Sequence, residues 1–89
     1  MPVVIVPEAY RGPTRGVSRI EVDAGTVREA LEAVEKDHAG FLTMVLDGSG
    51  KPHPFVKLFV NEAQLPADAL DTGLGKDDRL EILAAIAGG

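Results

Sequence analysis

The sequence predicts an α+β domain in which one main helix packs on one face of a mixed sheet of four to five strands. Short β-branched or alternating runs lie near both ends and in the second half of the chain, and one amphipathic stretch lies between them. The predicted order is strand, strand, helix, strand, short strand, strand. A single helix has to bury its apolar stripe against the single sheet. This arrangement is the β-grasp fold.

The first two strands are predicted to form a hairpin with a long connection. Residues 3–6 are a β-branched and apolar run ended by Pro7, and residues 17–23 alternate, with Ile20 and Val22 on one face. The connection over residues 8–16 contains Gly12-Pro13 and Gly16, which are typical of turns.

The helix is predicted to begin at a capping box. The Thr26 hydroxyl is available to the backbone amide of Glu29, and the Glu29 side chain can reach back. Gly40 is the predicted stop. Between the cap and this stop, apolar residues recur at helical spacing on one stripe: Val27, Ala30, Leu31 and Val34.

The second half of the chain contains the predicted central strand, which covers residues 55–60. Residues 41–46 are apolar but too short to distinguish a helical turn from a strand, and residues 47–50 form a loop. Residues 55–60 and 79–85 are predicted strands. A short edge segment is expected around residues 64–65, and a surface loop over residues 66–78.

Strand alternation assigns a buried and an open face. Val56, Leu58 and Val60 are expected to face the helix, as are Leu80 and Ile82 of the last strand. Phe55, Phe59 and Leu83 then lie on the opposite face, and an exposed patch of this kind typically marks a protein contact. The alternatives are that a loop covers these side chains or that the phase is shifted by one residue.

Composition limits the possible functions. The chain has 89 residues, a net charge of −5 and no cysteine, so we expect one small domain without disulfides, thiol nucleophiles or cysteine metal sites. The acidic balance argues against nucleic acid and anionic membranes. The start of the chain lacks the pattern of a signal peptide, and we expect a cytoplasmic protein. His38 and His53 lack the spacing of a metal or catalytic motif, and residues 73–77 do not complete a phosphate-binding loop. We therefore expect no intrinsic catalytic residue and no metal site.

The end of the chain is the most informative motif. Gly88-Gly89 follows an apolar run over residues 80–87 and leaves a bare glycine carboxylate. Because glycine has no Cβ, such a tail can enter a channel too narrow for side chains and present its terminal carbon to another protein. The alternative is an ordinary frayed terminus. We expect a β-grasp domain over residues 1–87 and a flexible C-terminal tail over residues 84–89.

The helix start, the predicted strands and the C-terminal segment together resemble a known family. This is the MoaD/ThiS-type family of ubiquitin-like sulfur carriers, which includes the small subunit of molybdopterin synthase and the thiamine sulfur carrier. The resemblance runs the whole chain, through residues 26–31, 55–61, 70–72, 77–83 and 86–89. Residues 4–7, with Arg11, Thr14 and Gly16, look closest to the CysO-like carriers, which donate sulfur for cysteine biosynthesis. Residues 83–87 lack the proline that family members often carry before the tail.

The resemblance implies a protein substrate rather than an enzyme. An E1-like enzyme of the MoeB/ThiF type would adenylate the Gly89 carboxylate, with Ala87 and Gly88 threading its channel. A sulfur donor would then give a C-terminal thiocarboxylate. ATP and the donor would be used by that partner, and no cofactor would be bound here. The free carrier is expected to be a monomer.

The acceptor of the sulfur stays open at this point. A cysteine synthase-like enzyme is the leading expectation, and molybdopterin synthesis, tRNA thiolation or a secondary-metabolite pathway are the alternatives. A ubiquitin-like protein modifier and a passive binding module are further ones.

Overall fold

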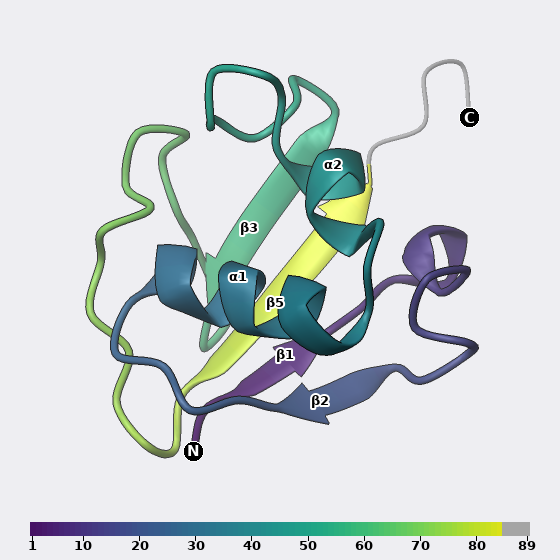
Figure 1. The fold of residues 1–89 in the computed structure, drawn as a ribbon. Helices are drawn as coiled ribbons and strands as arrows, with labels where there is room; N and C mark the ends of the chain where they lie inside the picture. The colour runs from purple at the N-terminus through teal and green to yellow at the C-terminus, as the bar shows by residue number, and fades with distance from the viewer. Residues whose placement is uncertain (85–89) are drawn as a thin grey trace.

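The computed structural model describes residues 1–84 and has the predicted β-grasp architecture (Figure 1). Eight elements follow one another: β1 (Val3–Ile5), η1 (Glu8–Tyr10), β2 (Arg19–Glu21), α1 (Val27–Asp37), α2 (Phe41–Val45), β3 (Val56–Val60), β4 (Ala63–Gln64) and β5 (Arg79–Ala84). No helix within residues 1–84 is long and apolar enough to cross a membrane.

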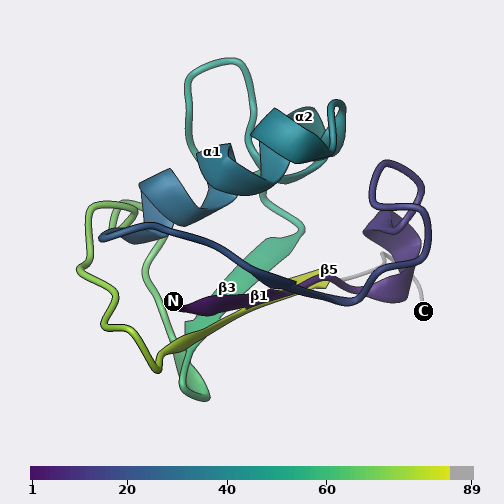
Figure 2. The same cartoon turned by 60° about the horizontal axis from the view of Figure 1, so that its bottom comes forward.

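The sheet has five strands in the order β2-β1-β5-β3-β4. β1 pairs antiparallel with β2, which confirms the hairpin, and parallel with β5. The pairs β3–β5 and β3–β4 are antiparallel. β5 is therefore the central strand, although it is the last element of the described residues. The predicted central position of the strand over residues 55–60 is wrong, because β1 pairs with the far side of β5 and moves β3 toward the edge of the sheet. Figure 2 shows both α-helices on one side of the sheet, while the other side has no helix or strand of the described chain over it.

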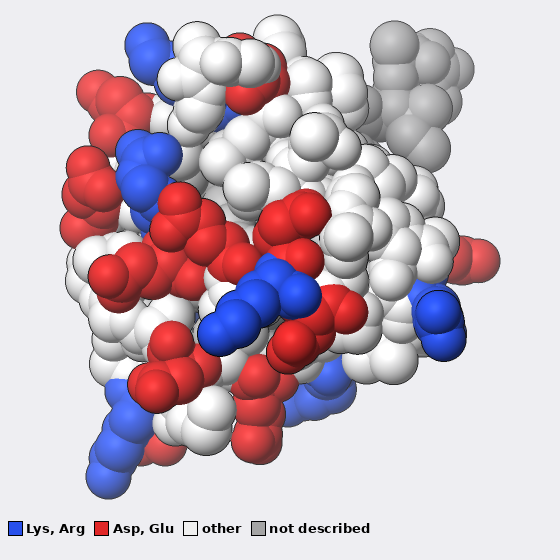
Figure 3. All heavy atoms as spheres, viewed as in Figure 1, with Lys and Arg blue, Asp and Glu red and all other residues white. Residues whose placement is uncertain are grey.

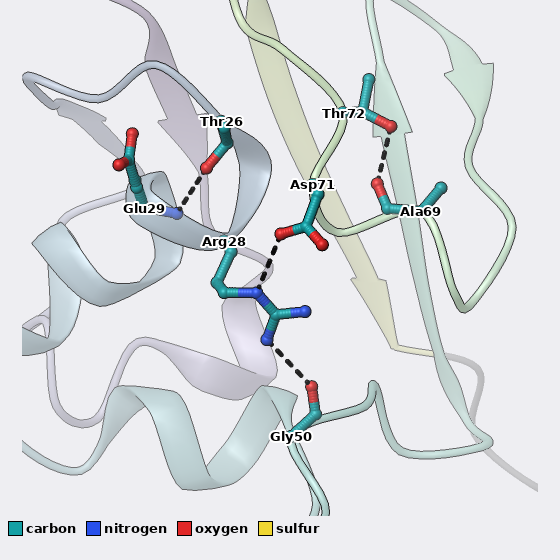
Figure 4. A network of polar contacts seen from close by, with 7 residues as sticks. All are labelled: Thr26, Arg28, Glu29, Gly50, Ala69, Asp71 and Thr72. Atoms are coloured by element: carbon teal, nitrogen blue, oxygen red, sulfur yellow. Dashed lines mark hydrogen bonds and ion pairs between the residues drawn. The ribbon is translucent and has the colours of Figure 1, made fainter.

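The start of α1 is capped more completely than the sequence predicts. The Thr26 hydroxyl accepts from the Glu29 amide at 3.1 Å, as expected (Figure 4). The Glu29 carboxylate, however, accepts from the Gly25 amide at 2.9 Å, one residue before the cap. Backbone carbonyls of the loop before β5 accept the two preceding helix amides: Val27 N–H donates to Thr72 and Arg28 N–H donates to Leu70.

Residues 41–45 form a second, short helix, which settles the ambiguity left by the sequence. α1 ends at Asp37, and Gly40, with φ of 99°, is the residue before α2. A glycine cap has no side chain, so Glu35 of α1 supplies the missing acceptors. Its carboxylate accepts from the Gly40 amide at 3.1 Å and from the Leu42 amide at 2.7 Å. The completely buried Phe41 is held against the core in this way.

The hydrophobic core lies between the helices and the sheet, and it confirms the predicted strand phase. Val56, Leu58, Leu80 and Ile82 are buried, and Val60 packs against the same cluster. The apolar stripe of α1 is completely buried: Val27, Ala30, Leu31 and Val34.

Candidate docking face and the root of the C-terminal tail

The C-terminal segment begins at the end of the central strand. β5 is paired on both sides, with β1 through residues 79–81 and with β3 through residues 80–84, where Ala84 lies opposite Val56. Because β5 is paired on both sides, its end at Ala84 is held in a fixed position. Ala87, Gly88 and Gly89 lie outside the described residues, so their predicted roles and the proposed tail remain predictions.

Leu83 and Phe55 are the exposed large apolar residues beside this point. The exposed fractions are 43% for Leu83 and 47% for Phe55. Leu83 lies on the open face of β5, directly opposite the exposed Lys57 of β3. Phe55 comes directly before β3, next to the pair formed by Val56 and Ala84. An apolar surface with a basic neighbour therefore lies beside the last described residues of β5.

Phe59 is less exposed than the sequence analysis expects. It lies on the open face of β3 but is half-buried. Its neighbours on both adjacent strands are long side chains, Glu81 of β5 and Gln64 of β4. These side chains can cover part of the ring, because side chains directly opposite across strands are in contact range. Exposure of Phe59 is thus corrected to partial exposure, whereas Leu83 and Phe55 have the exposure expected of a docking patch.

A short turn fixes the position of Phe55. The amide of Val56 donates to the carbonyl of His53 at 2.9 Å, and the amide of His53 donates to Val45 of α2 at 3.0 Å. The rings of His53 and Phe55 are stacked, with centroids 5.1 Å apart and an interplanar angle of 7°. The His53 Nε2 atom also lies 3.0 Å from the Thr43 carbonyl of α2. Phe55 is therefore an apolar group held by the fold.

β1 contributes to the open face in a way that the sequence analysis missed. Val3 and Ile5 are half-buried on this face, paired with Arg79 and Glu81 of β5. A shallow groove runs between Ile5, Arg19, Arg79 and Glu81. Val3 and Ile5 alternate with the buried Val4 and Val6, and this alternation indicates an outer face. The parallel partner of β1, however, is 76 residues away in the sequence, so local patterns cannot identify it.

Two loop carboxylates have structural roles. Asp47 accepts from the Ser49 hydroxyl and from the amides of Ser49 and Lys51, and these hydrogen bonds lower its pKa. The pKa of Asp78 is also lowered, by hydrogen bonds from the Gly75 amide and the Asn61 side chain. Both carboxylates stabilise turns in their charged forms.

The other candidate groups lie apart from this surface. His38 is the cap residue directly after α1, and its amide donates to the Val34 carbonyl. Within residues 1–84 no three histidine, cysteine or acidic side chains are grouped so that they could hold a metal ion. Figure 3 shows the opposite, helix-covered face, where acidic side chains predominate around α1 with a few basic ones among them, and an uncharged area lies around α2. Charge is mixed there and does not form a single basic surface.

The geometry therefore defines a small β-grasp protein with one covered and one open sheet face and a C-terminal segment that starts from the central strand. The model of the ThiS family matches residues 8–89, so the match includes the terminal Gly88-Gly89. The chain belongs to the ThiS family of ubiquitin-like β-grasp sulfur carriers.

Solved structures agree with this assignment. The chain is 32% identical to a chain in the crystal structure of the Amycolatopsis orientalis BexX/CysO complex, with a TM-score of 0.89 and 100% of both chains covered. It is 26% identical to Mycobacterium tuberculosis CysO, with a TM-score of 0.88 over 97% of this chain and 100% of that chain. SAMP1 from Haloferax volcanii, at 19% identity and a TM-score of 0.77 over 99% of this chain and 98% of that one, shares the fold. A comparison with curated protein sequences gives no match.

Proposed function

We propose that the chain is a CysO-like sulfur carrier whose C-terminal carboxylate at Gly89 is converted to a thiocarboxylate that donates sulfur in cysteine biosynthesis. The observation that carries the proposal is the ThiS-family match, which extends to the terminal Gly88-Gly89. The likeness to CysO structures at 32% and 26% identity favours the cysteine pathway over the other acceptors considered for such carriers.

The chemistry requires a second protein. A carboxylate is anionic and resonance-stabilised, so nucleophiles do not attack it and it has to be activated. It first attacks the α-phosphate of ATP, pyrophosphate leaves, and an acyl-adenylate forms. Sulfide (HS⁻) from the sulfur source then attacks the acyl carbon, AMP leaves with one former carboxylate oxygen, and loss of a proton gives the thiocarboxylate. An E1-like enzyme supplies ATP and the catalytic groups. This chain acts as substrate and carrier in the cytoplasm and needs no bound cofactor.

The docking patch of Phe55, Phe59 and Leu83 is the proposed contact with that enzyme. Its position beside the root of the C-terminal segment supports this assignment, because a partner seated there is close to the chain end it modifies. The A. orientalis structure is that of a BexX/CysO complex, which supports the view that proteins of this type work in contact with a protein partner.

The chain end can be tested directly. Intact-mass analysis after incubation with ATP, an E1-like enzyme and a sulfur source should show sulfur replacing oxygen in the wild-type protein. One residue added after Gly89 should abolish the change and leave the circular dichroism spectrum unaltered, because the reacting carbon is displaced while no core residue is touched. Gly88→Ala should reduce adenylation at an unchanged melting temperature, since a Cβ obstructs a tight channel. Unmodified wild-type protein beside a competent activating enzyme would contradict the proposal.

The docking patch needs a separate test. Leu83→Asp should weaken binding to the activating enzyme by about 2 kcal/mol, a hot-spot-sized loss. Val17→Asp is the matched control, because Val17 is 44% exposed and lies outside the patch. A titration in which both variants bind as tightly as the wild type would remove Leu83 from the interface without affecting the proposal for Gly89.

A further inference from the structure

The free edge of β2 is a second exposed surface, separate from the docking patch. β2 is the terminal strand of the sheet and pairs with β1 alone. The Ser18 carbonyl and the Val22 amide bond toward β1. Because hydrogen-bonding groups alternate in direction along an antiparallel strand, the amides and carbonyls of Arg19 and Glu21 point away from β1. Within residues 1–84 no other strand pairs with them.

Charged side chains usually protect a sheet edge from pairing. On β2, however, the two residues with outward-facing backbone groups have opposite charges, Arg19 positive and Glu21 negative. Both side chains are exposed. We propose that two copies of this chain associate through antiparallel pairing of their β2 edges, centred on Ile20, with Arg19 of each copy opposite Glu21 of the other. In this register the outward-facing backbone groups of each copy meet those of the other.

Charge disfavours the neighbouring registers to different degrees. A shift of two residues in one direction sets Arg19 against its own counterpart. A shift in the other direction sets Glu21 against its own counterpart, while Arg19 then lies opposite the exposed Asp23. Like charges directly opposite across strands are destabilising. A shift of one residue brings groups already bonded to β1 against the free ones and places side chains on opposite faces. The proposed register is therefore the one that contains no like-charged pair and forms both opposite-charge pairs within β2.

The helix side of this edge carries a groove between β2 and α1. The groove is lined by apolar residues (Met1, Ile20, Val22 and Ala33), by Lys36, and by three acidic residues (Glu21, Asp23 and Asp37). A two-fold axis perpendicular to the paired strands puts both α1 helices on the same side of the joined sheet. It also sets the two Ile20 side chains beside each other.

The association leaves the proposed carrier site free. β1 separates β2 from β5, so Leu83 and the end of β5 stay outside the interface. A three-residue edge buries little surface compared with stable dimers. The pairing is consequently weak and reversible, and dilute protein is monomeric, in line with the expectation from the sequence.

Sedimentation velocity on the untagged full-length chain over a rising concentration series is the test. The wild type should shift toward a dimer, whereas Arg19→Glu and Glu21→Arg should each lower the association constant by about tenfold, because both cross-strand pairs become like-charged. An equimolar mixture of the two variants should associate again, since each then offers the charge that the other lacks. Lys51→Glu is the control, because it makes the same charge change in an exposed loop.

A wild type that stays monomeric at the highest concentration would overturn the proposal. So would dimers that persist in both single variants, or a mixture that fails to associate while the wild type does. The double variant Arg19→Glu with Glu21→Arg restores the pairs within one chain. Its failure to dimerise would exclude the proposed register, whatever the single variants do.

Discussion

At the scale of single residues, Tyr10 is the clearest conflict in the core. Its side chain is 7% exposed, and its hydroxyl has no hydrogen-bond partner among the described residues. Burial raises the pKa of this hydroxyl. A buried polar group without a partner loses its hydration without compensation.

Tyr10→Phe should therefore stabilise the domain by about 1 kcal/mol, because it removes the uncompensated hydroxyl and keeps the ring. Urea unfolding followed by circular dichroism measures the change in the free energy of unfolding. Lower stability of the variant would show that the hydroxyl has a partner in the folded protein.

Leu83 and Leu58 test the two faces of the sheet at the same scale. Leu83→Asp should change the free energy of unfolding by less than about 1 kcal/mol, because the new carboxylate is exposed and lies opposite Lys57. Leu58 is 3% exposed, and Leu58→Asp should unfold the domain by burying an unpaired charge. Thermal melts of the two variants decide the matter. The reverse pattern would mean that the proposed docking face belongs to the core.

At the scale of elements, α2 depends on a side chain from α1. Glu35→Ala should cost about 1–2 kcal/mol of stability, since it leaves the Gly40 and Leu42 amides without their acceptors. Glu35→Gln, which keeps one good acceptor, should lose less. Glu32→Ala is the matched control on the exposed side of the same helix. Denaturant midpoints should rank Glu32→Ala above Glu35→Gln and Glu35→Ala lowest. Equal midpoints would contradict the capping role.

At the scale of the whole molecule, Asp47 and Asp78 make stability depend on pH. Each has a folded-state pKa below its ordinary value of 3.8. A carboxylate of this kind stabilises the fold fully above its unfolded pKa, and the contribution is lost as pH falls through the folded pKa. The wild type should thus lose stability below about pH 4.

Asp78→Asn separates this effect from general acid unfolding. The variant should be less stable than the wild type at neutral pH, and the difference should shrink as the pH falls through the acid range where Asp78 becomes protonated. Chemical denaturation at a series of pH values provides the comparison. A constant difference across the series would show that the charge of Asp78 does not stabilise the turn.

The sequence by itself determined the features that depend on nearest neighbours along the chain. The Thr26 cap follows from residue types three positions apart, and the buried faces of β3 and β5 follow from alternation within each strand. The motif Gly88-Gly89 is visible without a fold, and together with the resemblance over the rest of the chain it indicated the family and the proposed chemistry.

Tertiary structure decided the features that depend on which segments meet. It paired β1 with β5, which are distant in the sequence. It placed the carboxylate of Glu35 at the start of α2, a helix that the local pattern could not identify. It left Phe59 half-buried, opposite Glu81 and Gln64 on the adjacent strands. It also left the edge of β2 open. Alternation along a strand indicates which of its faces is apolar. The neighbours across the sheet, however, come from segments that are distant in the sequence. The exposure of a side chain, the capping of α2 and the open edge of the sheet are therefore fixed only when those segments pack together.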